Sequence, residues 1–205
     1  MKRNVFMVSF LALMVFSCDK EPIITMEPDN GLSSTNATAS VNATYGYLSF
    51  SSAMASNGHT MYVESDNVAP FFGAFPNGVA GGNTLSVHPK SVQGSGIFIH
   101  NDENGDLVGS GTWTATELVS YKNYGPTEDP NFPFADGRAG FANIRIHLMA
   151  DGGAEFDAIL YIRCLLAGND STPPSWVEGI RINVQDALNF NKTVPGGGTL
   201  FLDLN

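Results

Sequence analysis

Three arginines at equal spacing are the first residues in this chain that could do chemistry. Arg145, Arg163 and Arg181 stand eighteen residues apart, and each follows an isoleucine. A guanidinium group presents its N–H donors in a planar fork that matches the oxygens of a carboxylate or a phosphate. If the three lie on neighbouring strands, with Tyr161 and His147 beside them, they could line the mouth of a barrel and bind an anionic ligand. The plainer interpretation is the solvent-facing side of an antiparallel sheet.

Two carboxylates are the candidates for acid–base catalysis. Glu117 shares the predicted face of its strand with Trp113, and a carboxyl group buried on such a face holds its proton and can act as an acid or a base. On the outer face the same residue would be an ordinary solvated charge. An enzyme would combine Glu117 or Asp157 with Tyr161, His147 and the three arginines in a barrel lumen. Glu117 and Asp157 are therefore hypotheses, and the catalytic residues stay undetermined.

The chain contains none of the short motifs that mark common active sites, since it has no GxSxG, HExxH, P-loop or CxxC pattern. The histidines fall in separate segments without the spacing of metal ligands. They are His59, His88, His100 and His147. The segment Asp102–Asp106 has the first ligand spacings of an EF-hand loop, but Leu107 replaces the required glycine and Trp113 the bidentate glutamate. We therefore predict a polar hairpin tip there, and expect no metal and no cofactor.

Two predicted long loops are further candidates for a functional site. The first runs from Lys122 to Gly137, and the second, from Gly168 to Val177, contains Trp176. Loops of this length in a compact domain are often functional. An exposed Trp176 would offer a stacking platform for a sugar ring, whereas a packed one would be a lid over the core.

Three segments position these side chains, and in each of them apolar and polar residues alternate as is typical of half-buried strands. The segments are residues 139–151, 155–166 and 178–190. A three-residue turn at 152–154 would pair Ile144 with Ile162 and keep the apolar residues on one face, because a slip of one residue exchanges the faces. The same register places Arg145 opposite Tyr161.

The rest of the domain is predicted to be more antiparallel sheet. Asn104-Gly105 marks the turn of a hairpin over residues 94–121, in which Gly96 pairs with Trp113. Further strands are expected at 45–51, 59–64, 84–88 and 199–204, the last of them pairing with the first. These segments predict an all-β domain, a single antiparallel barrel of about eight to ten strands, because closure removes unpaired edges. A two-sheet sandwich is the alternative.

The first residues have the composition of a secretion signal. Lys2 and Arg3 precede the apolar run Val5–Phe16, which is too short for a transmembrane helix. The run ends in Val15-Phe16-Ser17-Cys18, which resembles the lipobox of bacterial lipoproteins. The resemblance implies cleavage before Cys18, acylation of that cysteine and anchoring to a membrane by several acyl chains.

The resulting organisation is a signal peptide at 1–17, a lipidated cysteine with a flexible tether at 18–43, and one β domain at 44–205. The tether is predicted from its Ser, Thr, Asn, Ala and Pro content, which leaves little to bury. Lipidation of Cys18 leaves Cys164 without a cysteine partner. Cys164 lies on a predicted apolar strand face, where a thiol usually behaves as a small buried hydrophobe.

The charge balance restricts the class of partner. The chain has 20 acidic and 10 basic residues, and removal of Lys2 and Arg3 leaves eight basic residues and a formal charge of −12. This charge argues against nucleic acid as a partner. We expect a membrane-anchored lipoprotein of the bacterial cell envelope, periplasmic or surface-exposed, whose β domain binds a small molecule, a lipid or a glycan. An envelope enzyme and a structural or adhesive lipoprotein are the alternatives.

Overall fold

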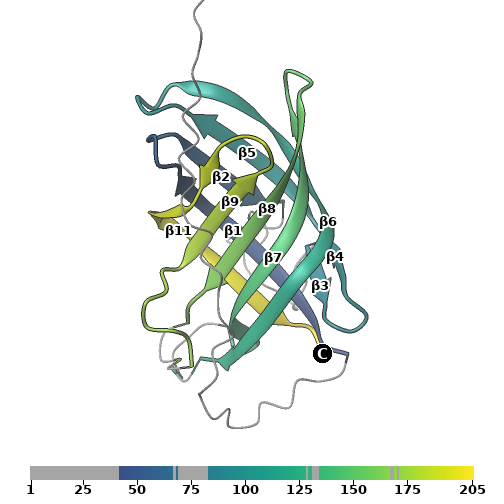
Figure 1. The fold of residues 1–205 in the computed structure, drawn as a ribbon. Helices are drawn as coiled ribbons and strands as arrows, with labels where there is room; N and C mark the ends of the chain where they lie inside the picture. Colours follow the sequence, from purple (N-terminus) through teal and green to yellow (C-terminus); the bar gives the residue numbers. More distant parts are fainter. Residues whose placement is uncertain are drawn as a thin grey trace, which may run out of the picture. The chain divides into compact units, whose positions relative to one another are not determined.

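The computed structural model describes residues 42–66, 68, 83–127, 129–130, 134–166, 169 and 171–205. In this part of the chain eleven β-strands belong to one antiparallel sheet (Figure 1). The predicted all-β class is thereby confirmed. The predicted signal peptide, Cys18 and nearly all of the predicted tether lie outside the described residues.

The strands follow the predicted segments closely. In chain order they are β1 (Thr44–Met54), β2 (Thr60–Ser65), β3 (Thr84–Ser86), β4 (Ser91–Gln93), β5 (Ser95–Asn101), β6 (Leu107–Pro126), β7 (Gly137–Ala150), β8 (Glu155–Cys164), β9 (Gly179–Val184), β10 (Asn189–Phe190) and β11 (Lys192–Asp203). The segment 178–190, predicted as one strand, is divided into β9 and β10. The chain turns between them at Asp186, whose φ of 56° is incompatible with a continuous strand.

The order of the strands closes part of the sheet into a ring (Figure 1). The sheet runs β10-β9-β8-β7-β6-β5-β2-β1-β3-β4, and β11 pairs with both β1 and β7. The ring therefore consists of β1, β2, β5, β6, β7 and β11. The long β1–β11 ladder confirms the predicted pairing of the first strand with the last. Closure is partial because the β7–β11 ladder has only two residue pairs, Arg138–Phe201 and Gly137–Leu202.

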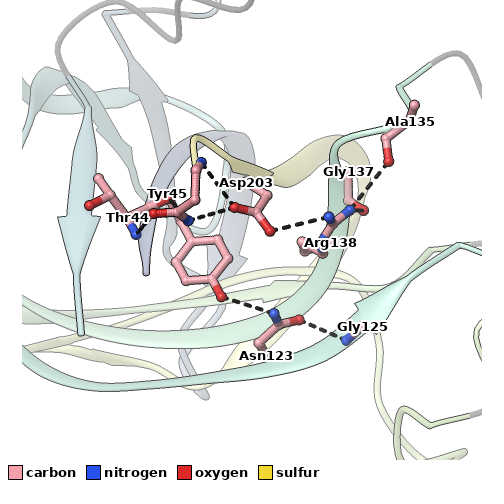
Figure 2. Close-up of polar contacts among 9 residues, drawn as sticks. Thr44, Tyr45, Asn123, Gly125, Ala135, Gly137, Arg138 and Asp203 are labelled. Atoms are coloured by element: carbon pink, nitrogen blue, oxygen red, sulfur yellow. Dashed lines mark hydrogen bonds and ion pairs between the residues drawn. The ribbon is translucent and has the colours of Figure 1, made fainter. Parts of the chain in front are cut away.

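Polar side chains tie four strands together at this closure (Figure 2). Arg138 on β7 forms an ion pair with Asp203 on β11, with 3.1 Å between Nη2 and Oδ2. Its Nη1 also donates to the carbonyl oxygen of Gly137 at 2.9 Å. Asn123 on β6 donates from Nδ2 to the hydroxyl of Tyr45 on β1 at 3.1 Å. The first and third of these contacts link β7 to β11 and β6 to β1 through side chains, and the second gives the Gly137 carbonyl a partner.

The predicted faces of β7 and β8 are confirmed, but the predicted register is wrong by two residues. Ile144 lies opposite Leu160. The turn consists of residues 151–153 because Asp151 is held on β6: its N–H donates to the Ser110 carbonyl at 2.8 Å, and its carboxylate accepts from the Ser110 hydroxyl. A shift of two residues returns every side chain to its own face, so the buried residues are still the predicted ones.

The β5–β6 hairpin has the predicted pairing in its body, with Gly96 opposite Trp113. Its tip is a three-residue turn instead of the predicted two-residue one. The reason is the carboxylate of Asp102, which accepts the backbone N–H groups of Asn104 at 2.8 Å and of Asp106 at 2.9 Å. These bonds, that of Asp106 foremost, hold the pKa of Asp102 below its usual value. The predicted polar tip is confirmed.

Strand β6 bends through three bulges in its ladder with β7. They lie between Ala115 and Glu117, between Leu118 and Ser120, and between Asn123 and Gly125. A bulge lets two residues oppose one and bends the strand, which helps the sheet to curl. The third bulge carries β6 on to Pro126, so the predicted loop from Lys122 to Gly137 is wrong over its first five residues.

The inner face of the sheet is filled with apolar side chains. The largest fully buried ones are Trp113, Tyr47, Phe190, Phe201, Leu85, Ile144, Ile146, Leu148, Leu160, Ile162, Ile180 and Ile182. Cys164 is also fully buried, as predicted, and burial raises the pKa of its thiol to about 12. Among the described residues we find no helix with the length and apolar character needed to cross a membrane.

The contact between Gly96 and Trp113 leads to a stability prediction. A Cβ atom at Gly96 would lie 1.9 Å from the carbonyl oxygen of Glu64 and 2.6 Å from Nε1 of Trp113, whereas a Cβ at Gly109 would meet nothing within 4 Å. We expect Gly96→Ala to lower the free energy of unfolding by about 3 kcal/mol or more, because backbone must move. Gly109→Ala should stay within about 0.5 kcal/mol of the wild type. Urea denaturation measures both; equal effects would contradict the close packing at Gly96.

Candidate functional site

The side chains predicted to bind a ligand lie on the outer face of β7, β8 and β9. Arg145, Arg163, Arg181, Tyr161 and His147 are partly exposed. Their chain neighbours on these strands include isoleucines that are fully buried on the other face. The plainer prediction, a solvent-facing side of the sheet, therefore agrees with the structure, and the alternative of a barrel lumen is wrong because the inner face of these strands is apolar.

Glu117 also lies on the outer face, because the first bulge of β6 reverses its side relative to Trp113. It is opposite Arg145 and forms an ion pair with it, 3.0 Å from Nε to Oε2. Asp157 pairs with Nδ1 of His147 at 3.1 Å. The two carboxylate side chains are 58% and 57% exposed, and pairs so exposed contribute about 0.2–1 kcal/mol. The predicted enclosure of Glu117 and Asp157 is wrong, although Arg145 and Asp157 do share a hollow of about 180 Å³.

Trp176 is packed and does not form an open platform. Its ring centroid lies 5.3 Å from that of Tyr124 and 5.4 Å from that of Phe141. The guanidinium of Arg163 lies over the indole, 4.8 Å from its centroid. With three neighbours around it, the indole is closer to the predicted lid than to a stacking surface for a sugar.

The described residues contain no group of three or more His, Cys, Asp or Glu side chains that could hold a metal ion. Besides the buried Cys164 thiol, the described residues include a partly buried carboxylate, Glu178, which accepts the backbone N–H of Thr199 at 3.1 Å. Burial raises the pKa of Glu178 above its usual value, and the hydrogen bonds from Thr199 partly oppose this. Glu178 was not among the predicted site residues, because it stands directly before β9 and matches no motif.

An apolar pocket of about 560 Å³ opens at the end of the sheet opposite the closure. Its walls come from seven strands and from the turns that follow β7 and β9. They are formed by Met61, Phe98, His100, Val108, Gly109, Ser110, Leu148, Ala150, Asp151, Gly152, Ala154, Phe156, Val184, Ala187, Leu188 and Phe190. Small-molecule sites typically have about 300–1,000 Å³ and mostly apolar walls with a few polar groups. The pocket meets both conditions.

A chain of polar side chains leads from the solvent to this pocket. Nε2 of His100 lies 2.9 Å from Nδ1 of His59, and Nε2 of His59 lies 3.3 Å from the carboxylate of Glu103. The edge of the His100 ring meets the ring of Phe190, with 5.5 Å between centroids. His100 thus contacts an apolar wall of the pocket on one side and a second imidazole on the other.

The contacts between Glu103, His59 and His100 determine which imidazole nitrogens carry a proton when both rings are neutral. A carboxylate only accepts, so the N–H of His59 faces Glu103 from Nε2 when that ring is neutral. Nδ1 of His59 then accepts from Nε2–H of His100, which leaves Nδ1 of His100 as an acceptor. Burial, and then the neighbouring charge of His59, lower the pKa of His100; Asp102 opposes them. His100 is therefore neutral at neutral pH and can accept a proton.

His59 and His100 are 41 residues apart and do not have the spacing of metal ligands, so the sequence does not predict their contact. They meet because β2 pairs with β5, which places Met61 opposite His100. The sequence signal for this contact was the pair of turns at Asn57-Gly58 and Asn104-Gly105, whose tips lie side by side: a Cβ atom at Gly58 would come within 3.0 Å of Cβ of Glu103.

Comparisons with protein-family models, with curated proteins and with solved structures found no match to this chain.

The contact between the two imidazoles leads to a pH prediction. We expect His100 to titrate below the usual value of about 6.5. His59→Asn should raise the pKa of His100 toward that value, because the variant removes a neighbouring positive charge. NMR titration of the imidazole C–H resonances measures this. His88→Asn, on the exposed turn after β3, is the control and should leave His100 unchanged; an unchanged pKa in His59→Asn would show that the rings are not coupled.

Proposed function

We propose that the β domain binds an apolar small molecule or a single lipid chain in the pocket at the open end of the sheet. The observation that carries the proposal is the pocket itself, which has about 560 Å³ of space and largely apolar walls. Water gains few hydrogen bonds in such a space, and an apolar ligand is favoured there by removal of its surface from water.

The polar groups of the pocket support a ligand with one polar end. His100 is a polar side chain of the lining. The Ser110 hydroxyl donates to Asp151 at 2.5 Å, and Ser110 is opposite Ile99 in the ladder, so its side chain lies on the other face from His100. The apolar body of the ligand would lie against Phe98, Leu148 and its neighbours, and its polar end would meet His100. A hydrogen bond in this place would orient the ligand, and the apolar contacts would supply most of the affinity.

The proposal also places the protein at a bacterial membrane. The lipobox-like segment ending at Cys18 and the tether rich in small polar residues support a lipoprotein held at a bacterial membrane, with the β domain in the periplasm or at the cell surface. A domain anchored there would take its ligand from the envelope. The acidic charge of the chain is consistent with anchoring by acyl chains and not by attraction to anionic lipids.

The second candidate is an enzyme that acts in the same pocket. The Glu103–His59–His100 chain favours it, because a carboxylate that orients one imidazole and a second imidazole that faces a pocket can accept a proton and pass it to solvent. Turnover of the bound molecule would distinguish an enzyme from a binder, which shows only saturable affinity.

Ligand capture is tested by blocking the pocket. Ala154 lies at its exposed rim, whereas Ala135 is an exposed alanine at the other end of the sheet. We expect the neutral dye N-phenyl-1-naphthylamine to bind the unlipidated Cys18→Ser chain saturably, with a rise in fluorescence. Ala154→Trp should weaken binding at least about tenfold, or about 1.4 kcal/mol, because the indole fills the entrance. Ala135→Trp is the matched control. Absence of saturable binding, or equal loss in both variants, would refute the pocket as the site.

The anchor is tested separately. We expect the wild-type chain, expressed in a bacterium with the lipoprotein pathway, to incorporate radiolabelled palmitate and to sediment with membranes. Cys18→Ser should lose the label and move to the soluble fraction, because the acceptor sulfur is absent. Cys164→Ser is the control, since its buried thiol is no acceptor. Membrane sedimentation of Cys18→Ser without label would contradict the anchor.

A further inference from the structure

Two of the three regularly spaced arginines have no anionic partner among the described residues. Arg163 is opposite Gly179 in the β8–β9 ladder, and Arg181 is opposite Tyr161, so the two arginines are diagonal neighbours on the outer face. Residues in that relation lie within reach of long side chains. No carboxylate of the described residues forms an ion pair with either guanidinium, and no hydrogen bond from either is found in that part of the chain.

Both guanidinium groups have an unused donor. Nε of Arg163 and Nε of Arg181 are buried, and neither has a hydrogen-bond partner in the described part of the chain. A buried donor without an acceptor destabilises the fold by about 1–3 kcal/mol, and more when the group is charged. Such an arrangement persists where something outside the chain completes it, and a basic pair with free donors is complementary to an anion.

Aromatic rings fix the orientation of Arg163. The guanidinium carbon lies 4.8 Å from the centroid of Trp176 and 5.9 Å from that of Phe141. Trp176 is itself packed against Tyr124. Contact with these rings limits the positions that the guanidinium can take, and the N–H groups that point away from the rings are the part that can bind a carboxylate or phosphate.

The other arginines of the domain show that the lack of a partner is specific. Arg145, on the same outer face, forms an ion pair with Glu117, and Arg138 forms one with Asp203. The chain has twice as many acidic as basic residues, 20 against 10, so carboxylates are abundant. Arg163 instead faces a second positive charge: burial, and then the charge of Arg181, lower the pKa of Arg163.

We propose that Arg163 and Arg181 form a binding site for a small oxyanion with a charge near −2, either a phosphate group or a pair of carboxylates. The anion would neutralise both guanidiniums and accept from the edge of Arg163, with the hydroxyl of Tyr161 as a further donor beside Arg181. This site lies on the outer face, on the other side of the sheet from the apolar pocket, and it does not depend on the function proposed for that pocket.

The test is the Tm of the full chain, measured as a function of the concentration of sodium phosphate and, separately, of sodium succinate. Sodium chloride keeps the ionic strength constant. Ligand that binds only the native state raises Tm in proportion to the logarithm of its concentration above Kd. We expect phosphate, succinate or both to raise Tm beyond chloride with this logarithmic dependence, and the two arms identify the preferred oxyanion. If neither raises Tm, the proposal is overturned.

Three variants locate the site. Arg181→Gln should weaken the apparent affinity at least tenfold, and Arg163→Lys should weaken it because the ammonium retains the charge but loses the planar fork. Arg145→Gln is the matched control on the same face and should keep wild-type affinity, because its charge is already paired with Glu117. Equal weakening in Arg145→Gln and Arg181→Gln would overturn the proposal in favour of unspecific attraction to surface charge.

The Tm of Arg181→Gln without ligand distinguishes loss of the binding site from damage to the fold. Without oxyanion, Arg181→Gln should melt at the wild-type temperature or above, because it removes repulsion between two like charges and a buried donor that has no acceptor. A stable Arg181→Gln protein that still binds the oxyanion with wild-type affinity would refute the site, and one with lost affinity would support it.

Discussion

The need to pair the edges of a long antiparallel sheet governs this structure. Strand β6 alone has 20 residues, and each unpaired strand edge would expose a row of N–H and carbonyl groups. The chain resolves this by returning its last strand to its first, and by letting β11 contact β7 as well. The β7–β11 ladder is short, so the Arg138–Asp203 ion pair and the Asn123–Tyr45 hydrogen bond hold a junction that few backbone bonds secure.

Partial closure has consequences for where chemistry can occur. The inner face is filled near the junction by aromatic residues such as Phe201 and Tyr47, whereas the far end of the sheet carries the apolar pocket. Glu117, Arg145 and Asp157 lie on the outer face, where solvent screens their pairs. The two proposed sites differ accordingly: the first is an apolar pocket, and the second is a pair of guanidinium groups on the outer face. The aromatic packing around Arg163 is what makes the second more than a solvated charge.

The bulges of β6 show why the candidate catalytic residues were misplaced. Alternation along the strand put Glu117 on the face of Trp113, and that inference is valid only for a strand of uniform pleat. One extra residue before Glu117 reverses the relation, so the carboxylate reaches Arg145 in solvent while Trp113 stays buried over Gly96. Bulges respond to the curvature that the whole sheet needs, and no local pattern of residue types marks them.

The amino-acid sequence alone determined the class of the fold, the faces of β7, β8 and β9, and the body of the β5–β6 hairpin, because alternation and turn residues act over a few positions. It also placed Cys164 in the core. Only the tertiary structure decided the register after Asp151, the meeting of His59 with His100, and the isolation of Arg163 and Arg181 from every carboxylate of the described residues. These features depend on contacts between residues far apart in the chain, and such contacts are selected by closure and packing of the complete sheet.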